Sequence, residues 1–215
     1  MRERIKKIHA FLNDDSRPIQ ERLFGLVSFF AVLALLLVVL MGIIIGESTL
    51  DLLFIGIGTL VFTVIILLSF RTAHVNAGIN LTSFIVVFVV LPVTFFTGGG
   101  IYGGSPLWFA FGLFFVAMIT TDRARIFFLI SSFMVGTICY YFAYTRPSLV
   151  TAHDFKMAHQ DSYMSLILVC LILTLIVSFQ MRLFKKENER TELFHAVEHM
   201  IWNIKFPDRK STRLN

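Results

Sequence analysis

The sequence predicts an all-α integral membrane protein: six transmembrane helices, with a short interfacial helix before them and a cytoplasmic helix after them. Of its 215 residues, 56% are hydrophobic, and the mean hydropathy is +0.77. Soluble domains are about 45–50% apolar even when glycine is counted. The apolar residues form long blocks without the polar face that a soluble helix presents to water. Basic residues cluster between these blocks in alternate loops, as in a multi-pass protein.

Six segments approach the length of about 20 apolar residues that a membrane-spanning helix needs. They are residues 23–45, 50–70, 77–96, 106–121, 126–144 and 163–184, which together define a transmembrane domain over 23–184. The fourth segment is short. It gains length if Ile101 and Tyr102 join it, or it forms a partly sunken helix. Pro92 predicts a kink near the end of the third segment.

The distribution of basic residues predicts the orientation. With the N-terminus inside, the inner segments carry Arg2, Arg4, Lys6, Lys7, Arg17, Arg22, Arg71, Arg123, Arg125, Arg182, Lys185, Lys186 and Arg190. The outer loops carry Arg146 and Lys156. Because Lys and Arg concentrate on the cytoplasmic side, we expect a plasma-membrane protein with both termini in the cytoplasm.

The segments that flank the spans have distinct compositions. Residues 1–22 form a basic amphipathic tail, which we expect to lie on the lipid headgroups as a short helix over residues 1–12. Residues 185–207 begin a cytoplasmic helix whose apolar seam comprises Leu193, Val197, Met200 and Ile204. This seam is shorter than a full coiled coil and predicts pairing with a second copy of the chain.

The last eight residues, 208–215, read DRKSTRLN and resemble one translated frame of a common sequencing-library adapter. We interpret them as a sequence artefact and exclude them from the fold. The encoded protein is then expected to continue past the cytoplasmic helix.

A glycine-rich loop precedes the fourth span. It contains a formal GxGxxG, which binds a dinucleotide only between a strand and a helix, so we exclude that function. An aromatic belt at a membrane interface is one interpretation. The other is a ligand-sensing loop whose backbone amides line a small concavity. Its residues are Thr97, Gly98, Gly99, Gly100, Tyr102, Gly103, Gly104, Ser105 and Trp108.

The longest outer loop is predicted to contain His153, Asp154, His159 and Asp161. Imidazole and carboxylate groups can bind a metal or respond to external pH. Their spacing matches no compact ligand set, so a solvated loop is the preferred interpretation.

Two further motifs have structural interpretations. Residues 195–199 match HxxEH, an inverted zinc-protease motif, but the downstream acidic ligand is missing. Gly42 and Gly46 form a GxxxG, which predicts close helix packing within the domain or in a dimer. The middle of each predicted span lacks charged residues and histidine, which argues against a proton or sodium pump. We predict no catalytic, cofactor-binding or metal-binding residue in this chain.

Residues 11–24, 94–109 and 183–189, together with the six-span layout, resemble the N-terminal membrane sensor region of bacterial sensor histidine kinases of the Firmicutes type. The resemblance covers roughly residues 10–190 and implies a truncated input domain of a two-component system. The helix over 185–207 would then be a signalling helix. ATP, Mg²⁺ and a response regulator would belong only to a missing output domain, because His195 and His199 lie in no phosphorylation box.

Similar membrane regions also precede diguanylate cyclase domains, so a GGDEF output domain is an alternative. A small complete permease or membrane scaffold is the third. The expected partners are the lipid bilayer and a second copy of the chain, and nucleic acid is not among them. The resemblance does not identify the stimulus.

Overall fold

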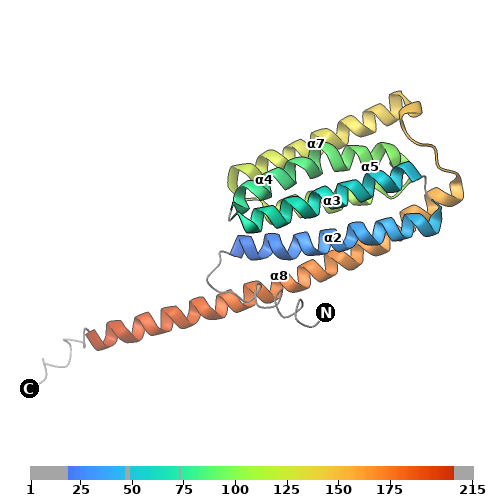
Figure 1. The fold of residues 1–215 in the computed structure, drawn as a ribbon. Helices are drawn as coiled ribbons and strands as arrows, with labels where there is room; N and C mark the ends of the chain where they lie inside the picture. Colours follow the sequence, from blue (N-terminus) through green and yellow to red (C-terminus); the bar gives the residue numbers. More distant parts are fainter. Residues whose placement is uncertain (1–18, 47–48, 73, 206–215) are drawn as a thin grey trace, which may run out of the picture. The chain divides into compact units, whose positions relative to one another are not determined.

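The computed structural model describes residues 19–46, 49–72 and 74–205, and every regular element in these ranges is a helix. The elements, traced in Figure 1, are α2 (Ile19–Ile45), α3 (Thr49–Arg71), α4 (Val75–Ile85), η1 (Val86–Val90), α5 (Leu91–Thr97), η2 (Gly100–Tyr102), α6 (Ser105–Ile119), α7 (Asp122–Thr145), η3 (Pro147–Leu149) and α8 (Phe155–Lys205). The predicted all-α class is confirmed. The predicted interfacial helix over 1–12 and the adapter-like residues 208–215 lie outside the described residues.

Five helical stretches in the described ranges are long and apolar enough to cross a membrane. They are Gln20–Ile44, Leu52–Arg71, Val75–Thr97, Asp122–Thr145 and Phe155–Glu198. By the length and composition of these helices, the chain is a multi-pass membrane protein. The fourth predicted span corresponds to α6, which is apolar but has only 15 residues.

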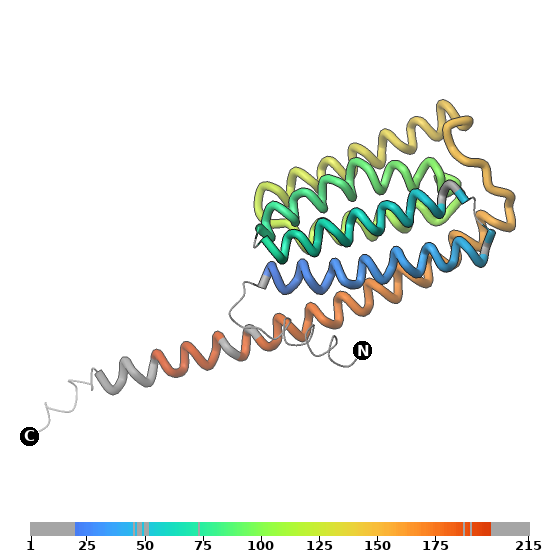
Figure 2. Tube along the Cα trace, viewed as in Figure 1, coloured from blue at the N-terminus to red at the C-terminus, as the bar shows by residue number. Residues whose placement is uncertain are grey.

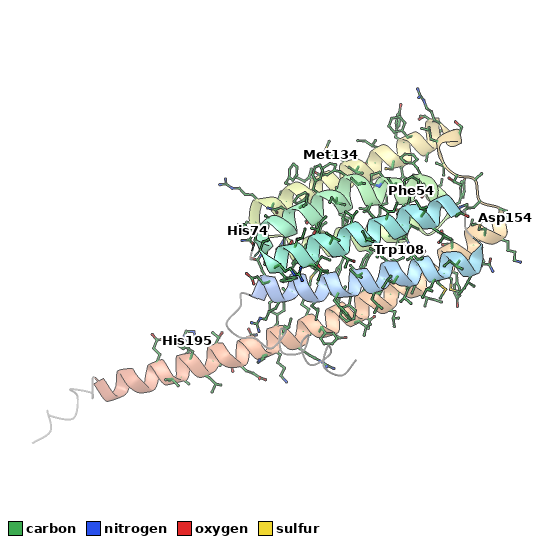
Figure 3. The ribbon with its side chains drawn as sticks, viewed as in Figure 1. Phe54, His74, Trp108, Met134, Asp154 and His195 are labelled. Carbon is green, nitrogen blue, oxygen red and sulfur yellow. The ribbon has the colours of Figure 1, made fainter. Side chains whose placement is uncertain are left out.

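The outward surface of the helices is apolar. Phe54 on α3 and Met134 on α7, both marked in Figure 3, are 54% and 61% exposed. Leu60 is 65% exposed on the same helix as Phe54. Side chains of this kind on the outside of a bundle suit hydrocarbon as solvent, which explains why the sequence lacks a polar helix face.

The chain divides within α8 into two compact units, one ending at Ile176 and the next beginning at Val177. In the first unit α2 packs against α3 and α6, and α7 packs against α4 and α6 (Figure 2). Its buried cluster comprises Leu91, Phe95, Phe109 and Cys139. The Phe95 ring meets the Phe109 ring edge-on at 5.9 Å, a favourable aromatic geometry. Aromatic packing thus holds α5, α6 and α7 together.

The third predicted span is interrupted by a π-helical turn, η1, immediately before α5. Leu91 N–H donates to the carbonyl of Val86, five residues earlier. Pro92 follows and has no N–H to offer. The Thr94 hydroxyl donates to the carbonyl of Val90 at 2.9 Å, which satisfies one acceptor near the break. The predicted irregularity at Pro92 is therefore a widened turn, of a kind that often marks functional sites.

Gly46 ends α2. Its φ is +82°, and its N–H donates to the Gly42 carbonyl at 3.0 Å, which is a left-handed helix cap. A Cβ built on Gly46 would meet nothing within 4 Å in the described chain. Within the described chain no helix packs closely on Gly46, where glycine serves the cap, and close packing in a dimer stays a prediction.

A tight turn joins α6 to α7. The Thr120 hydroxyl donates to the Val116 carbonyl at 2.6 Å, and Arg125 Nε donates to the Thr120 carbonyl at 2.8 Å. A cationic donor on the last carbonyls of a helix also complements the negative end of its dipole. The C-terminus of α6 is thereby fixed although the helix is short.

α8 begins at Phe155, ahead of the predicted last span. Asp154 Oδ1 accepts the Met157 N–H at 2.8 Å and caps the helix. His159 and Asp161 therefore lie in α8, and their placement in the outer loop was wrong. The predicted last span and the predicted cytoplasmic helix are parts of this one helix of 51 residues.

Candidate functional site

The predicted ligand-sensing loop joins α5 to α6. Gly99 and Gly100 have φ values of +76° and +61°, in the left-handed region that favours glycine. Gly98 N–H donates to the Thr94 carbonyl at 2.9 Å, and Tyr102 N–H donates to the Gly99 carbonyl at 3.3 Å. The two left-handed residues turn the chain out of α5 and into the start of α6.

One set of contacts connects this loop to residues 150–153. A Cβ on Gly99 would lie 2.8 Å from His153 Nδ1, and one on Gly100 would lie 2.8 Å from Val150 Cγ1. Thr151 N–H donates to the Phe96 carbonyl at 2.8 Å. Side chains of residues 150–153 thus pack directly on the loop backbone.

A second set of contacts connects the loop to α8. Gly104 N–H donates to Asp161 Oδ2 at 2.6 Å. A Cβ on Gly104 would overlap Ser165 Oγ, and one on Gly103 would overlap the Gly98 carbonyl oxygen. Glycine at these two positions therefore lets the loop backbone come within hydrogen-bond distance of α8.

The contact with α8 continues through two side chains. Ser165 Oγ donates to Asp161 Oδ1 at 3.2 Å, and Trp108 Nε1 donates to Ser165 Oγ at 3.0 Å. Ser165 is buried, and the Trp108 indole, marked in Figure 3, also packs edge-on against Phe111 at 5.8 Å. We call Gly104, Trp108, Asp161 and Ser165 the Asp161 connection.

The Asp161 carboxylate accepts its hydrogen bonds within the described residues from neutral donors, an amide and a hydroxyl. Gly104 is the N-cap of α6, so the carboxylate lies at the N-terminal end of that helix, where the helix dipole is positive. The distance from the Gly104 nitrogen to Asp161 Oδ2 is 2.6 Å.

The predicted loop residues do not all take part. Ser105 is buried, and its hydroxyl donates to the carbonyls of Thr94 and Gly98 at 3.1 and 3.3 Å. The Thr97 hydroxyl donates to Val93 in its own helix at 3.0 Å, and Tyr102 is 78% exposed. The glycines, Ser105 and Trp108 thus form one packed site, whereas the side chains of Thr97 and Tyr102 are directed elsewhere.

The acidic and imidazole groups near the loop have separate surroundings. His159 stacks on Phe155 at 6.3 Å, and Asp154, labelled at the N-terminal end of α8 in Figure 3, caps the helix. His153 Nδ1 is buried and has no hydrogen-bond partner among the described residues. Within the same residues, no three histidine, cysteine or acidic side chains form a group that could hold a metal ion.

Sequence reasoning missed Asp161 and Ser165 as site residues. Their spacing of four places both on one helix face, and such pairs interact. This spacing indicates a shared face only if both residues are helical, and the sequence favours a solvated loop at Asp161. Its partner lies 57 positions away, on a backbone amide that no sequence pattern marks.

The HxxEH residues lie in the second unit, in the C-terminal part of α8. His195 Nδ1 and Glu198 Oε2 are 3.6 Å apart, and both side chains are more than half exposed. This pair is an ordinary surface contact within a helix.

No protein-family model matches the sequence, and searches of the curated proteins and of the solved structures gave no significant match.

Proposed function

We propose that the chain is the membrane-embedded input domain of a bacterial signal-transduction histidine kinase. A glycine loop on the outer side would respond to a stimulus, and α8 would carry the response to a cytoplasmic output domain. The observation that carries the proposal is α8 itself: one helix contains Asp161, which holds the loop, and the charged stretch that follows Arg182.

The proposal requires six spans, with α6 as the fourth. Its 15 residues extend about 22 Å, which is less than the hydrocarbon thickness of about 30 Å. Two features compensate. Much of α6 is buried, including Phe109, Phe115 and Ile119. The irregular backbone of the glycine loop is also satisfied by protein groups, the condition under which such backbone is tolerated at membrane depth.

The orientation rests on the basic residues. Arg123 and Arg125 follow α6, and Arg182, Lys185 and Lys186 occupy the second unit. With six spans, all of these lie on the cytoplasmic side together with the N-terminus. The C-terminal part of α8 then emerges where a kinase domain would find ATP and a response regulator.

The second unit supplies a surface for pairing with a second copy. Leu193 and Val197 lie four residues apart and are 68% and 51% exposed. Lys185 and Glu189 form an exposed ion pair at 3.9 Å in the two turns before this seam. An exposed apolar seam on a helix is a surface through which two helices can pair. We expect the pairing to be weak in isolation because the seam is short.

The reading frame of the source gene tests the proposal. A phosphorylation box and an ATP-binding domain downstream of the α8 codons are the expected result. A GGDEF domain would replace the kinase by a diguanylate cyclase and keep the input role. A stop codon directly after the final Asn215 codon would contradict both output domains.

One observation favours a second candidate function, a proton-coupled permease. Asp161 is an ionisable residue on α8, two residues before the apolar segment 163–184, and ionisable residues on membrane-spanning helices often mark transport paths. Its two neutral donors and its position at the start of α6 favour a structural or signalling contact instead. Proton-coupled uptake by the chain in proteoliposomes, abolished by Asp161→Asn, would support the permease.

A further inference from the structure

We infer that the Asp161 connection is a releasable contact through which the glycine loop controls the conformation of α8. The inference rests on the proposed function and adds the residues at which a stimulus would act. In the bound state Asp161 holds the Gly104 amide and the Ser165 hydroxyl, and Ser165 holds Trp108. In the released state α8 no longer holds the loop.

The position of Asp161 is the first argument. It lies in the second turn of α8, and Ser165 lies one turn further on. The carboxylate is therefore part of the helix packing in the first unit, beyond the capping residue Asp154. Asp161 precedes the apolar segment 163–184, so the contact joins the glycine loop to the start of the predicted last span.

The closeness of the fit is the second argument. The backbone at Gly103 and Gly104 has no room for a Cβ, because the Gly98 carbonyl, Ser165 and Asp161 occupy that space. Packed interfaces do not deform continuously, and a hydrogen bond weakens steeply when its geometry is lost. A shift of the loop by the width of a methyl group must therefore break the contact with Asp161 or move α8 with it.

Reversibility is the third argument. Asp161 is only partly buried, so water can reach its carboxylate once the loop withdraws. Its bonded partners are neutral groups, so release leaves no opposite charge stranded in an apolar site. The bound and released states can then be close in free energy, which is the condition for a stimulus to shift the balance between them.

The continuity of α8 is the fourth argument. The same helix carries Asp161 and, beyond Val177, the exposed seam residues Leu193 and Val197. A change in the packing of α8 at Asp161 is therefore a change in the element that presents the proposed dimer surface. A glycine loop that contacted only residues 150–153 could not change the packing of α8 directly.

Hydrogen-exchange mass spectrometry on the full chain in lipid nanodiscs tests the inference. The variants are Asp161→Asn, which removes the charge, and Trp108→Phe, which removes only the indole N–H. The matched control is Asp154→Asn, because asparagine caps a helix as well as aspartate does. We expect exchange at the start of α6 to rise about tenfold in both variants, because each weakens or removes one hydrogen bond between α8 and the segment from Gly104 to Trp108. We also expect altered exchange in residues 177–205, while the control matches the parent protein.

Exchange in residues 177–205 decides between the two outcomes. Altered exchange near α6 together with unaltered exchange in residues 177–205 would overturn the inference and leave a merely structural fastening. If Asp161→Asn does not fold, Trp108→Phe gives the answer alone, since it preserves the carboxylate and an aromatic ring. The result is independent of the output domain, so a gene that encodes no kinase would refute the proposed function and leave this measurement standing.

Discussion

The Gly104 amide of α6 donates a hydrogen bond to Asp161 Oδ2 of α8 at 2.6 Å, across 57 positions of sequence. This bond joins the glycine loop to α8, the helix that continues to Lys205. It also places a carboxylate at the N-terminus of α6, where the helix dipole stabilises negative charge. In the proposed input domain, this hydrogen bond is the contact through which the glycine loop would act on α8.

Asp161→Asn is expected to lower the free energy of unfolding by about 1–3 kcal/mol. Hydrogen bonds to a charged acceptor contribute about that much, and the substitution replaces the carboxylate by a neutral amide. Unfolding in mixed detergent, followed by circular dichroism, measures the difference. Asp154→Asn serves as the control and should change the free energy of unfolding by less than about 0.5 kcal/mol. Equal effects of the two substitutions would show that the contact with Gly104 contributes nothing specific.

Gly104→Ala is expected to cost about 1–3 kcal/mol, because the new Cβ would overlap Ser165 Oγ. Ser165→Gly removes the side chain that it meets. The double variant should therefore lose less stability than the sum of the two single variants. Strict additivity in the same unfolding measurement would mean that loop and helix are not in contact at this point.

Trp108→Phe and Ser165→Ala remove the two ends of one hydrogen bond of 3.0 Å. Trp108→Phe should cost about 1 kcal/mol, and Ser165→Ala should cost more, because the Ser165 hydroxyl also donates to Asp161 Oδ1. The double variant should cost little more than Ser165→Ala alone, because the bond to the indole can be lost only once. A double-mutant cycle of unfolding free energies measures this coupling. A coupling energy near zero would show that the Trp108 indole N–H does not donate to Ser165 Oγ.

Leu91→Ala is expected to destabilise the bundle by about 2–5 kcal/mol, since Leu91 is 3% exposed and packs over Gly112. Leu81→Ala is the matched control, because Leu81 lies in the same span and is 49% exposed. The control should cost much less. Similar losses at both positions would contradict the packing of α5 against α6.

Much of the architecture could be predicted from the sequence. Blocks of apolar residues locate α2, α3 and α7 within a few residues, because a span must be uniformly apolar and about 20 residues long. The end of α2 at Gly46 also carries a sequence signal, since glycine is the preferred left-handed cap. Composition alone gave the class of the protein.

The site was less predictable. The glycine loop was recognised, but the reason for Gly103 and Gly104 is the approach of Ser165 and Asp161 from a distant helix. The sequence predicts the last span from residue 163, whereas α8 begins at Phe155. The mixed polar and apolar residues 155–161 resemble a loop in composition, although Asp154 caps a helix there. Hydropathy marks where lipid begins, and it does not mark where a helix begins. The π-helical turn lies directly before Pro92, but its five-residue hydrogen bond from Leu91 to Val86 carries no signal in the sequence.

The central claim is that α6 crosses the membrane, so that the glycine loop before it and the turn after Ile119 lie on opposite sides. With this crossing the chain has six spans, and α8 ends in the cytoplasm together with the N-terminus. Substituted-cysteine labelling tests it in intact cells, with Cys139 and Cys170 replaced by alanine. The account predicts that Tyr102→Cys reacts with a membrane-impermeant maleimide from outside. Arg123→Cys should react only after the membrane is opened. Reaction of both from outside would show that α6 does not cross, and it would place the end of α8 away from any cytoplasmic output domain.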